Sequence, residues 1–155
     1  KKILTLSIAY HHPRVLFAMK KRGFGAGRWN GFGGKVEEGE TIEDAARREA
    51  REEGGIEIKD IGKAGVIDFE FRGDPKILEV HIFKIGSFTG EPVETEEMRP
   101  QWFHLGEIPY DTMWSDDRHW LPLFLAGKKF RGRFLFDEPG SAKILESNLS
   151  EITEF

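Results

Sequence analysis

The chain has 155 residues, of which 39% are hydrophobic and 32% charged, and this composition is typical of a globular protein rather than a disordered one. A net charge of −4 argues against a nucleic-acid polymer as partner. The absence of cysteine excludes disulfides, thiolate metal sites and cysteine nucleophiles. Together with the absence of a long apolar run, it favours a cytoplasmic protein without a membrane partner. We expect one domain over residues 1–155 and no obligate protein partner.

The first third of the chain is predicted to contain two strands and a long glycine-rich loop. Residues 2–10 and 14–19 are rich in β-forming residues and should form a hairpin around residues 11–13. Residues 22–34 form the loop, in which Phe24, Trp29 and Phe32 are embedded. The loop lacks the Gly-Lys-Ser/Thr ending and the following helix of a nucleotide-binding P-loop, so we reject that interpretation.

Residues 42–53 are predicted to form a helix that carries acids on its apolar side. A capping pattern at Thr41 and Asp44 marks its start, and two glycines at residues 54–55 mark its end. At 100° per residue, one face collects the apolar residues Ile42, Ala45, Ala46 and Ala50. Glu49 and Glu53 fall within that face, and Glu52 lies on its flank.

Carboxylates on the buried side of a helix are costly unless a cation meets them. Because one arginine cannot satisfy three glutamates, the spacing favours a hard divalent cation such as Mg2+ or Mn2+, and Mg2+ usually accompanies phosphates. The alternative is a solvated helix with Glu/Arg pairs four residues apart. That alternative does not account for the fixed spacing between the glycines and all the acids.

The remainder of the chain is predicted to complete a mixed sheet with a second helix. Strands are expected near residues 57–71 and 77–85, an acidic loop over 88–99, a short strand over 101–105, and closing strands over 130–136 and 142–149. The second helix should begin with Ser115 as its capping residue and end near Lys128, with Pro122 inside it. The fold class is therefore α/β, a sandwich with a mixed sheet and two main helices.

The segment from Trp114 to Trp120 places two tryptophans around Asp116 and Asp117 at a predicted helix start. One interpretation is an ordinary helix N-terminus with tryptophans in the core. The other is a stacking platform for a planar base, beside carboxyl groups that bind its edge. Two adjacent acids that share a proton can both donate and accept hydrogen bonds.

From Gly34 to Ile56 the chain fits the pattern G-x5-E-x7-R-E-U-x-E-E-x-G-U, where U is a bulky aliphatic residue, and so resembles the Nudix hydrolases. Ala50 stands where that family prefers a larger aliphatic residue. Over nearly its full length, the chain also resembles the MutT-homologue oxidised-purine nucleoside triphosphatases. Residues 19–35, 69–71, 97–100 and 114–117 carry that likeness.

The resemblance implies a Nudix-type α/β/α sandwich and Mg2+-dependent hydrolysis of a purine nucleoside triphosphate, such as 8-oxo-dGTP, to the monophosphate and pyrophosphate. The implied metal ligands are the Gly33 carbonyl, Glu49, Glu52, Glu53 and Glu97. Glu53, or failing that Glu97, would activate water with Glu52 nearby, and Arg48 would brace a glutamate. The implied substrate contacts are Thr5, Lys20, Phe24, Asn30, Phe32, Gly34, Lys35, Phe69, Phe71, Leu78, Met98, Trp114, Asp116, Asp117, Trp120 and Phe136.

Two other functions remain open from the sequence. The first is a Nudix activity on another nucleoside diphosphate derivative or another modified purine, and the second is a catalytically weak domain that senses nucleotides. Leu78 and Ser115 depart from the expected Met and Pro of the resembled group, which leaves the fine substrate preference open.

Overall fold

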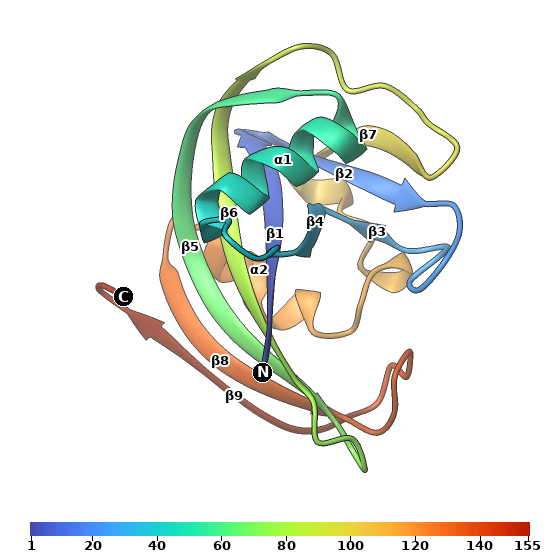
Figure 1. Cartoon of the computed structure of the whole chain (residues 1–155), viewed down its shortest axis with the longest axis vertical. Helices are drawn as coiled ribbons and strands as arrows, with labels where there is room; N and C mark the ends of the chain where they lie inside the picture. The colour runs from blue at the N-terminus through green and yellow to red at the C-terminus, as the bar shows by residue number, and fades with distance from the viewer.

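The computed structural model describes all 155 residues, and nine strands form a single curved sheet (Figure 1). The strands are β1 (Lys2–His11), β2 (Arg14–Lys20), β3 (Trp29–Asn30), β4 (Phe32–Lys35), β5 (Glu57–Phe71), β6 (Ile77–Thr89), β7 (Met98–His104), β8 (Lys129–Phe136) and β9 (Ile144–Ile152). The helices are α1 (Ile42–Gly54) and α2 (Asp117–Leu125), with two short 3-10 helices at Leu105–Glu107 and Tyr110–Thr112. Neither α-helix has the length and apolar character needed to cross a membrane.

Strand β1 lies inside the sheet and pairs with three other strands. The strand order is β3-β2-β1-β6-β5-β8-β9, with β4 paired to β1 and β7 paired to β2. The first half of β1 pairs antiparallel with β4, so that Thr5 lies opposite Gly34, and its second half pairs with β2. On its other side, β1 pairs parallel with β6 along its length. This mixed pairing brings the short glycine-containing strand β4 beside the centre of the sheet.

The two helices cover opposite faces of the sheet (Figure 1). On the α1 side, the core contains Ala9, Leu16, Ala18, Phe32, Ala50, Ile56, Ile58, Ile85 and Met98. On the α2 side, a larger core joins Ile8, Phe17, Ile67 and Ile82 to the helix residues Trp120, Leu121 and Phe124 and to the β8 phenylalanines Phe130, Phe134 and Phe136. The α/β/α sandwich with a mixed sheet and two helices, predicted from the sequence, is confirmed.

Helix α1 begins and ends where the capping residues predict. The Thr41 hydroxyl accepts a hydrogen bond from the Asp44 backbone N–H at 3.0 Å. Gly55 adopts the left-handed conformation at φ 68°, which closes the helix in the way that favours glycine. Gly54 lies against the Phe32 ring, where a Cβ atom would come within 2.7 Å of that ring. The helix is therefore fixed against the core at its C-terminal end, next to Glu53.

Several predicted boundaries are wrong. The loop predicted over residues 22–34 contains β3 and most of β4, β6 continues to Thr89 instead of residue 85, and β9 spans Ile144–Ile152 instead of 142–149. Helix α2 ends at Leu125 rather than near Lys128. Strand β7 starts at Met98 rather than residue 101, because residues 98–100 pair with β2 at the edge of the sheet, where Pro100 needs no N–H. Helix α2 starts at Asp117, and Ser115 does not cap it. Asp116 occupies the capping position without a capping hydrogen bond, because its carboxylate instead accepts from the Trp120 indole at 2.8 Å. Pro122 lies inside the helix as predicted.

Candidate active site

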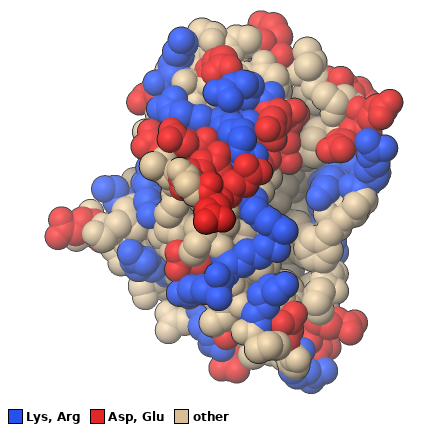
Figure 2. Space-filling view, in the orientation of Figure 1, with Lys and Arg blue, Asp and Glu red and all other residues tan.

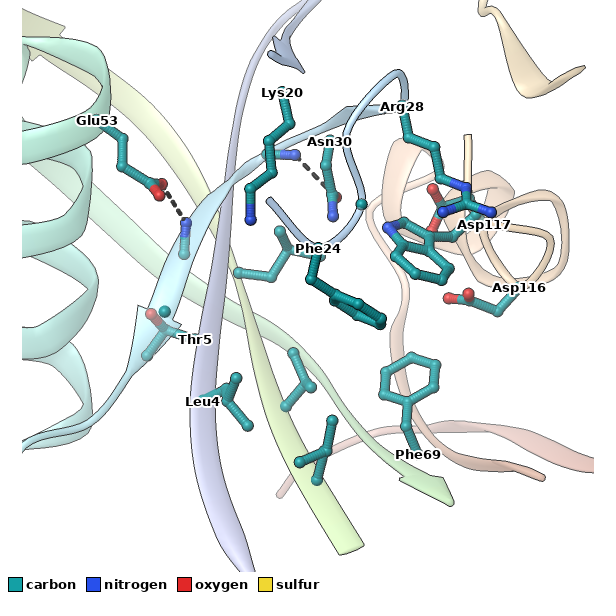
Figure 3. Close-up of a pocket in the computed structure, with 18 of the residues that line it drawn as sticks. Leu4, Thr5, Lys20, Phe24, Arg28, Asn30, Glu53, Phe69, Asp116 and Asp117 are labelled. Atoms are coloured by element: carbon teal, nitrogen blue, oxygen red, sulfur yellow. Dashed lines mark hydrogen bonds between the residues drawn. The ribbon is translucent and has the colours of Figure 1, made fainter. Parts of the chain in front are cut away.

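A cavity of about 310 Å³ lies on the α2 side of the sheet (Figure 3). Its floor and walls are apolar, formed by Leu4, Leu6, Phe69, Phe71, Leu78, Val80 and Phe136. Polar groups are concentrated at its two ends. One end holds Lys20, Gly33, Gly34 and Glu53, and the other holds Trp114, Asp116 and Asp117. A ligand with an apolar or planar middle and distinct polar ends fits this arrangement.

Glu53 projects from α1 towards β4 at the first end of the cavity (Figure 3). Its Oε1 accepts a hydrogen bond from the Gly33 backbone N–H at 2.8 Å. Burial, together with the charges of Glu49 and Glu97, raises the pKa of Glu53 to about 7, whereas Gly33 and Lys20 oppose the rise. A carboxyl group with such a pKa can accept a proton near neutral pH.

Arg48 braces the other glutamates of α1. Its guanidinium donates to Glu40 at 2.7 Å, to Glu49 at 2.8 Å and to Glu52 at 3.3 Å. It also donates to the Lys35 carbonyl at 3.0 Å, which fixes the end of β4 against the helix. The predicted bracing role of Arg48 agrees with these contacts, and Glu53 is left without a cationic partner.

Acidic side chains also surround a second cavity, which Glu53 shares with Glu52, Glu96, Glu97 and Arg22. No three acids or histidines are gathered closely enough to hold a metal ion as they stand. Arg48 engages Glu49 and Glu52, and Arg22 lies 3.5 Å from Glu97. These acidic side chains nevertheless fit a hard divalent cation, because their donor atoms are oxygens. A bound cation would also offset the cost of burying charge and the repulsion between carboxylates, which together raise the pKa of Glu53.

Asp116 and Asp117 form a buried pair at the other end of the cavity, with exposed fractions of 4% and 3%. Trp120 holds the Asp116 carboxylate, whereas Oδ2 of Asp117 has no hydrogen-bond partner. Burial raises the pKa of both carboxyls, and the charge of Asp116 raises that of Asp117 further. The pair therefore favours a proton on Asp117, so that it presents a donor and acceptors together.

Trp114 forms an aromatic wall beside this pair, and Arg28 supports it. The Arg28 guanidinium lies 4.1 Å from the Trp114 ring centroid, and its Nη2 donates to the Gly140 carbonyl at 3.1 Å. The Phe24 ring lies 5.2 Å from Trp114 and is exposed. Arg28 was not predicted from the sequence, because its only signal is its place in a loop without periodicity. The other unpredicted lining residues are Leu4, Leu6, Gly25, Gly31 and Val80.

Most of the predicted substrate contacts line the first cavity, namely Thr5, Lys20, Phe24, Asn30, Gly34, Phe69, Phe71, Leu78, Met98, Trp114, Asp116, Asp117 and Phe136. Three do not. Phe32 is 2% exposed in the α1-side core, and Trp120 is 1% exposed in the α2-side core. Lys35 is exposed at the end of β4, outside the cavity lining. Phe32 and Trp120 therefore support the site from below and do not form its wall.

The comparisons with known proteins agree with this geometry. Residues 7–124 match the family model of the NUDIX domain. The chain belongs to the Nudix family. It is 52% identical over 154 residues to the oxidized purine nucleoside triphosphate hydrolase of Mus musculus, covering 99% of this chain and 97% of the relative. The protein of the same name from Danio rerio is 52% identical over 153 residues, with the same two coverages.

A solved structure gives the same result for the fold. The mutator MutT protein from Bacillus halodurans superimposes with a TM-score of 0.84 at 25% identity, covering 96% of this chain and 97% of that one. Nudix enzymes generally need a divalent cation. In this structure, Glu53 and the acids of the second cavity are the residues whose oxygens fit such a cation.

Proposed function

We propose that this Nudix protein hydrolyses oxidised purine nucleoside triphosphates, such as 8-oxo-dGTP, to the monophosphate and pyrophosphate with Mg2+ as cofactor and Mn2+ as an alternative. The observation that carries the proposal is the buried Asp116–Asp117 pair beside Trp114, opposite the acid end of the same cavity. The names of the relatives that are 52% identical support it. The cytoplasmic location and the absence of an obligate partner protein stay predictions.

At the acid end, the residues that would hold the cation are Glu49, Glu52, Glu53, Glu97 and the Gly33 carbonyl. Bound Mg2+ would supply charge neutralisation for the phosphate oxygens and lower the pKa of an attacking water. Glu53, with its pKa of about 7, or Glu97 would orient that water and take its proton. Lys20 lines the cavity at this end and would bind a phosphate. Arg48 would hold Glu49 in position.

At the base end, Trp114 would stack on the purine while the acids bind its edge. Oxidation of guanine to its 8-oxo form adds one carbonyl and one ring N–H. The Asp117 carboxyl, whose Oδ2 has no partner, and the Asp116 carboxylate held by Trp120 would together offer a donor and acceptors for such an edge. A mismatched base would leave one of these buried groups unsatisfied, at a cost of about 1–3 kcal/mol.

The test is kcat/KM for 8-oxo-dGTP and dGTP, with and without Mg2+, for the wild type, Asp117→Asn and Trp114→Ala. We expect a preference of roughly 5- to 150-fold for 8-oxo-dGTP. Asp117→Asn should reduce the preference for 8-oxo-dGTP over dGTP more than it reduces the rate of 8-oxo-dGTP hydrolysis, because an amide cannot change its protonation. Trp114→Ala should weaken both purines together. Equal hydrolysis of the two nucleotides by the wild type would refute the proposed substrate class.

A further inference from the structure

Arg22 is the one cation among the residues that line the acidic second cavity. The other charged residues of that lining are Glu52, Glu53, Glu96 and Glu97. Figure 2 shows Asp and Glu atoms gathered on the face of the molecule that carries α1, with Lys and Arg atoms at their border. Neighbouring carboxylates repel one another, and the charge of Glu97 contributes to the raised pKa of Glu53. A single positive charge therefore faces four acids, in the cavity where a metal and the phosphates would meet in the function proposed above.

The backbone fixes Arg22 opposite these acids. Lys20 and Met98 are partners in the antiparallel β2–β7 ladder. One residue beyond that pair, the Lys21 backbone N–H donates to the Glu97 carbonyl at 2.7 Å. The end of β2 is thus tied to the end of the acidic loop that precedes β7, and the Arg22 side chain leaves the backbone next to this tie. Its position beside Glu97 follows from strand pairing and does not depend on the ion pair.

The two arginines that contact the predicted metal ligands differ in how firmly they are held. The Nη2 atom of Arg22 lies 3.5 Å from Glu97 and 3.6 Å from Glu96, and the Arg22 side chain is 60% exposed. An ion pair in such contact with solvent contributes little stability. Arg48, by contrast, is 19% exposed and donates to Glu49 at 2.8 Å as one of several acceptors. Arg22 can therefore leave its carboxylates at little cost in free energy, whereas Arg48 cannot.

We propose that Arg22 holds Glu97 in the metal-free protein, releases it when a divalent cation binds there, and then binds the phosphates of the nucleotide. This inference rests on the proposed function, because it assumes that Glu97 is a metal ligand and that the phosphates lie beside it. A divalent cation replaces the guanidinium because it carries twice the charge at a similar distance. The released guanidinium then lies next to phosphate oxygens, which accept its hydrogen bonds in pairs.

The first experiment measures Mn2+ binding by calorimetry, without nucleotide, in the wild type, Arg22→Gln and Lys21→Gln. Arg22→Gln keeps a polar side chain but removes the competing charge, so Mn2+ should bind roughly two- to five-fold more tightly. Lys21→Gln is the matched control, because Lys21 pairs with Glu94, which does not line the cavity. The control should bind Mn2+ as the wild type does. An unchanged affinity in Arg22→Gln, or an equal gain in Lys21→Gln, overturns the exchange at Glu97.

The second experiment measures KM for 8-oxo-dGTP at saturating Mg2+ in the same three proteins. Arg22→Gln should raise KM about five-fold, the upper end for a solvent-exposed ion pair, although the same variant binds metal more tightly. A merely structural role of Arg22 would not change the two affinities in opposite directions. An unchanged or lower KM overturns the contact with phosphate. If the wild type does not hydrolyse 8-oxo-dGTP, the proposed function is refuted, whereas the Mn2+ titration still tests the exchange because it needs no substrate.

Discussion

Replacement of Glu53 by Gln is expected to slow catalysis and, without metal, to stabilise the fold. In the unfolded chain Glu53 ionises near its ordinary pKa of 4.5, and in the folded protein only near 7. Ionisation therefore favours unfolding increasingly as the pH rises through this window. The stability associated with the protonated group is complete below pH 4.5 and is lost as the pH passes 7. A glutamine at this position has no such penalty and can still accept the hydrogen bond from the Gly33 N–H.

The difference between the two pKa values corresponds to about 3.4 kcal/mol of unfolding free energy. We reduce this to about 1–3 kcal/mol, because the carboxyl is only partly buried. For a chain of this size, Glu53→Gln should raise Tm by about 2–10 °C at pH 8 in chelator. The gain should disappear by about pH 4. Added Mg2+ should stabilise the wild type more than the variant by mass action. The value of kcat should fall by at least ~100-fold.

The assay is thermal unfolding at pH 8 and pH 4, with chelator and with Mg2+, followed by turnover of 8-oxo-dGTP. Glu52→Gln is the matched control, since the Glu52 side chain is 59% exposed and lies on the same helix. It should change Tm much less than Glu53→Gln does. If Glu53→Gln is no more stable than the wild type at pH 8 in chelator, the burial argument is refuted. Near-wild-type turnover would refute the catalytic assignment.

Three further outcomes test the site. Lys20→Ala should raise KM more than Lys21→Ala, because Lys20 lines the cavity while Lys21 is ion-paired outside it; equal KM values would contradict this. Arg28→Ala should raise KM for all purine nucleotides with little change in kcat, since it removes the cation stacked on the aromatic wall; steady-state kinetics with an unchanged KM would contradict it. Gly54→Ala should lower Tm, because its Cβ would lie 2.7 Å from the Phe32 ring; an unchanged melting curve would contradict it.

The parts of the molecule that could be predicted from sequence are those fixed by local spacing. Helix α1 is predictable within one residue, because its cap at Thr41, its glycine stop and its apolar period all lie within fifteen residues. The acids on its inner side follow from the same period. The hairpin of β1 with β2 was also predicted from neighbouring residues and is confirmed, whereas the pairing of β1 with β4 and β6 has no such local signal.

The parts that could not be predicted depend on contacts between distant segments. Arg28 reaches the Gly140 carbonyl across 112 residues of sequence, and nothing near residue 28 indicates that partner. The sequence does not distinguish Trp114 from Trp120, since both are tryptophans in the same short segment. Only the packing of α2 places Trp114 in the cavity wall and Trp120 in the core. The start of β7 at Met98 likewise depends on its pairing with β2.

In the function proposed above, the hydrogen bond from Trp120 to Asp116 would tie discrimination between bases to the integrity of one side of the molecule. Helix α2 has nine residues and contains a proline, whereas the acids of the phosphate end belong to α1 on the opposite face. Warming or a substitution beneath α2 should therefore release Asp116 before it disturbs Glu53. An enzyme damaged in this way would still cleave phosphoanhydrides but would begin to consume ordinary purine nucleotides. Loss of selectivity, rather than loss of turnover, would then be the first symptom of a weakened core.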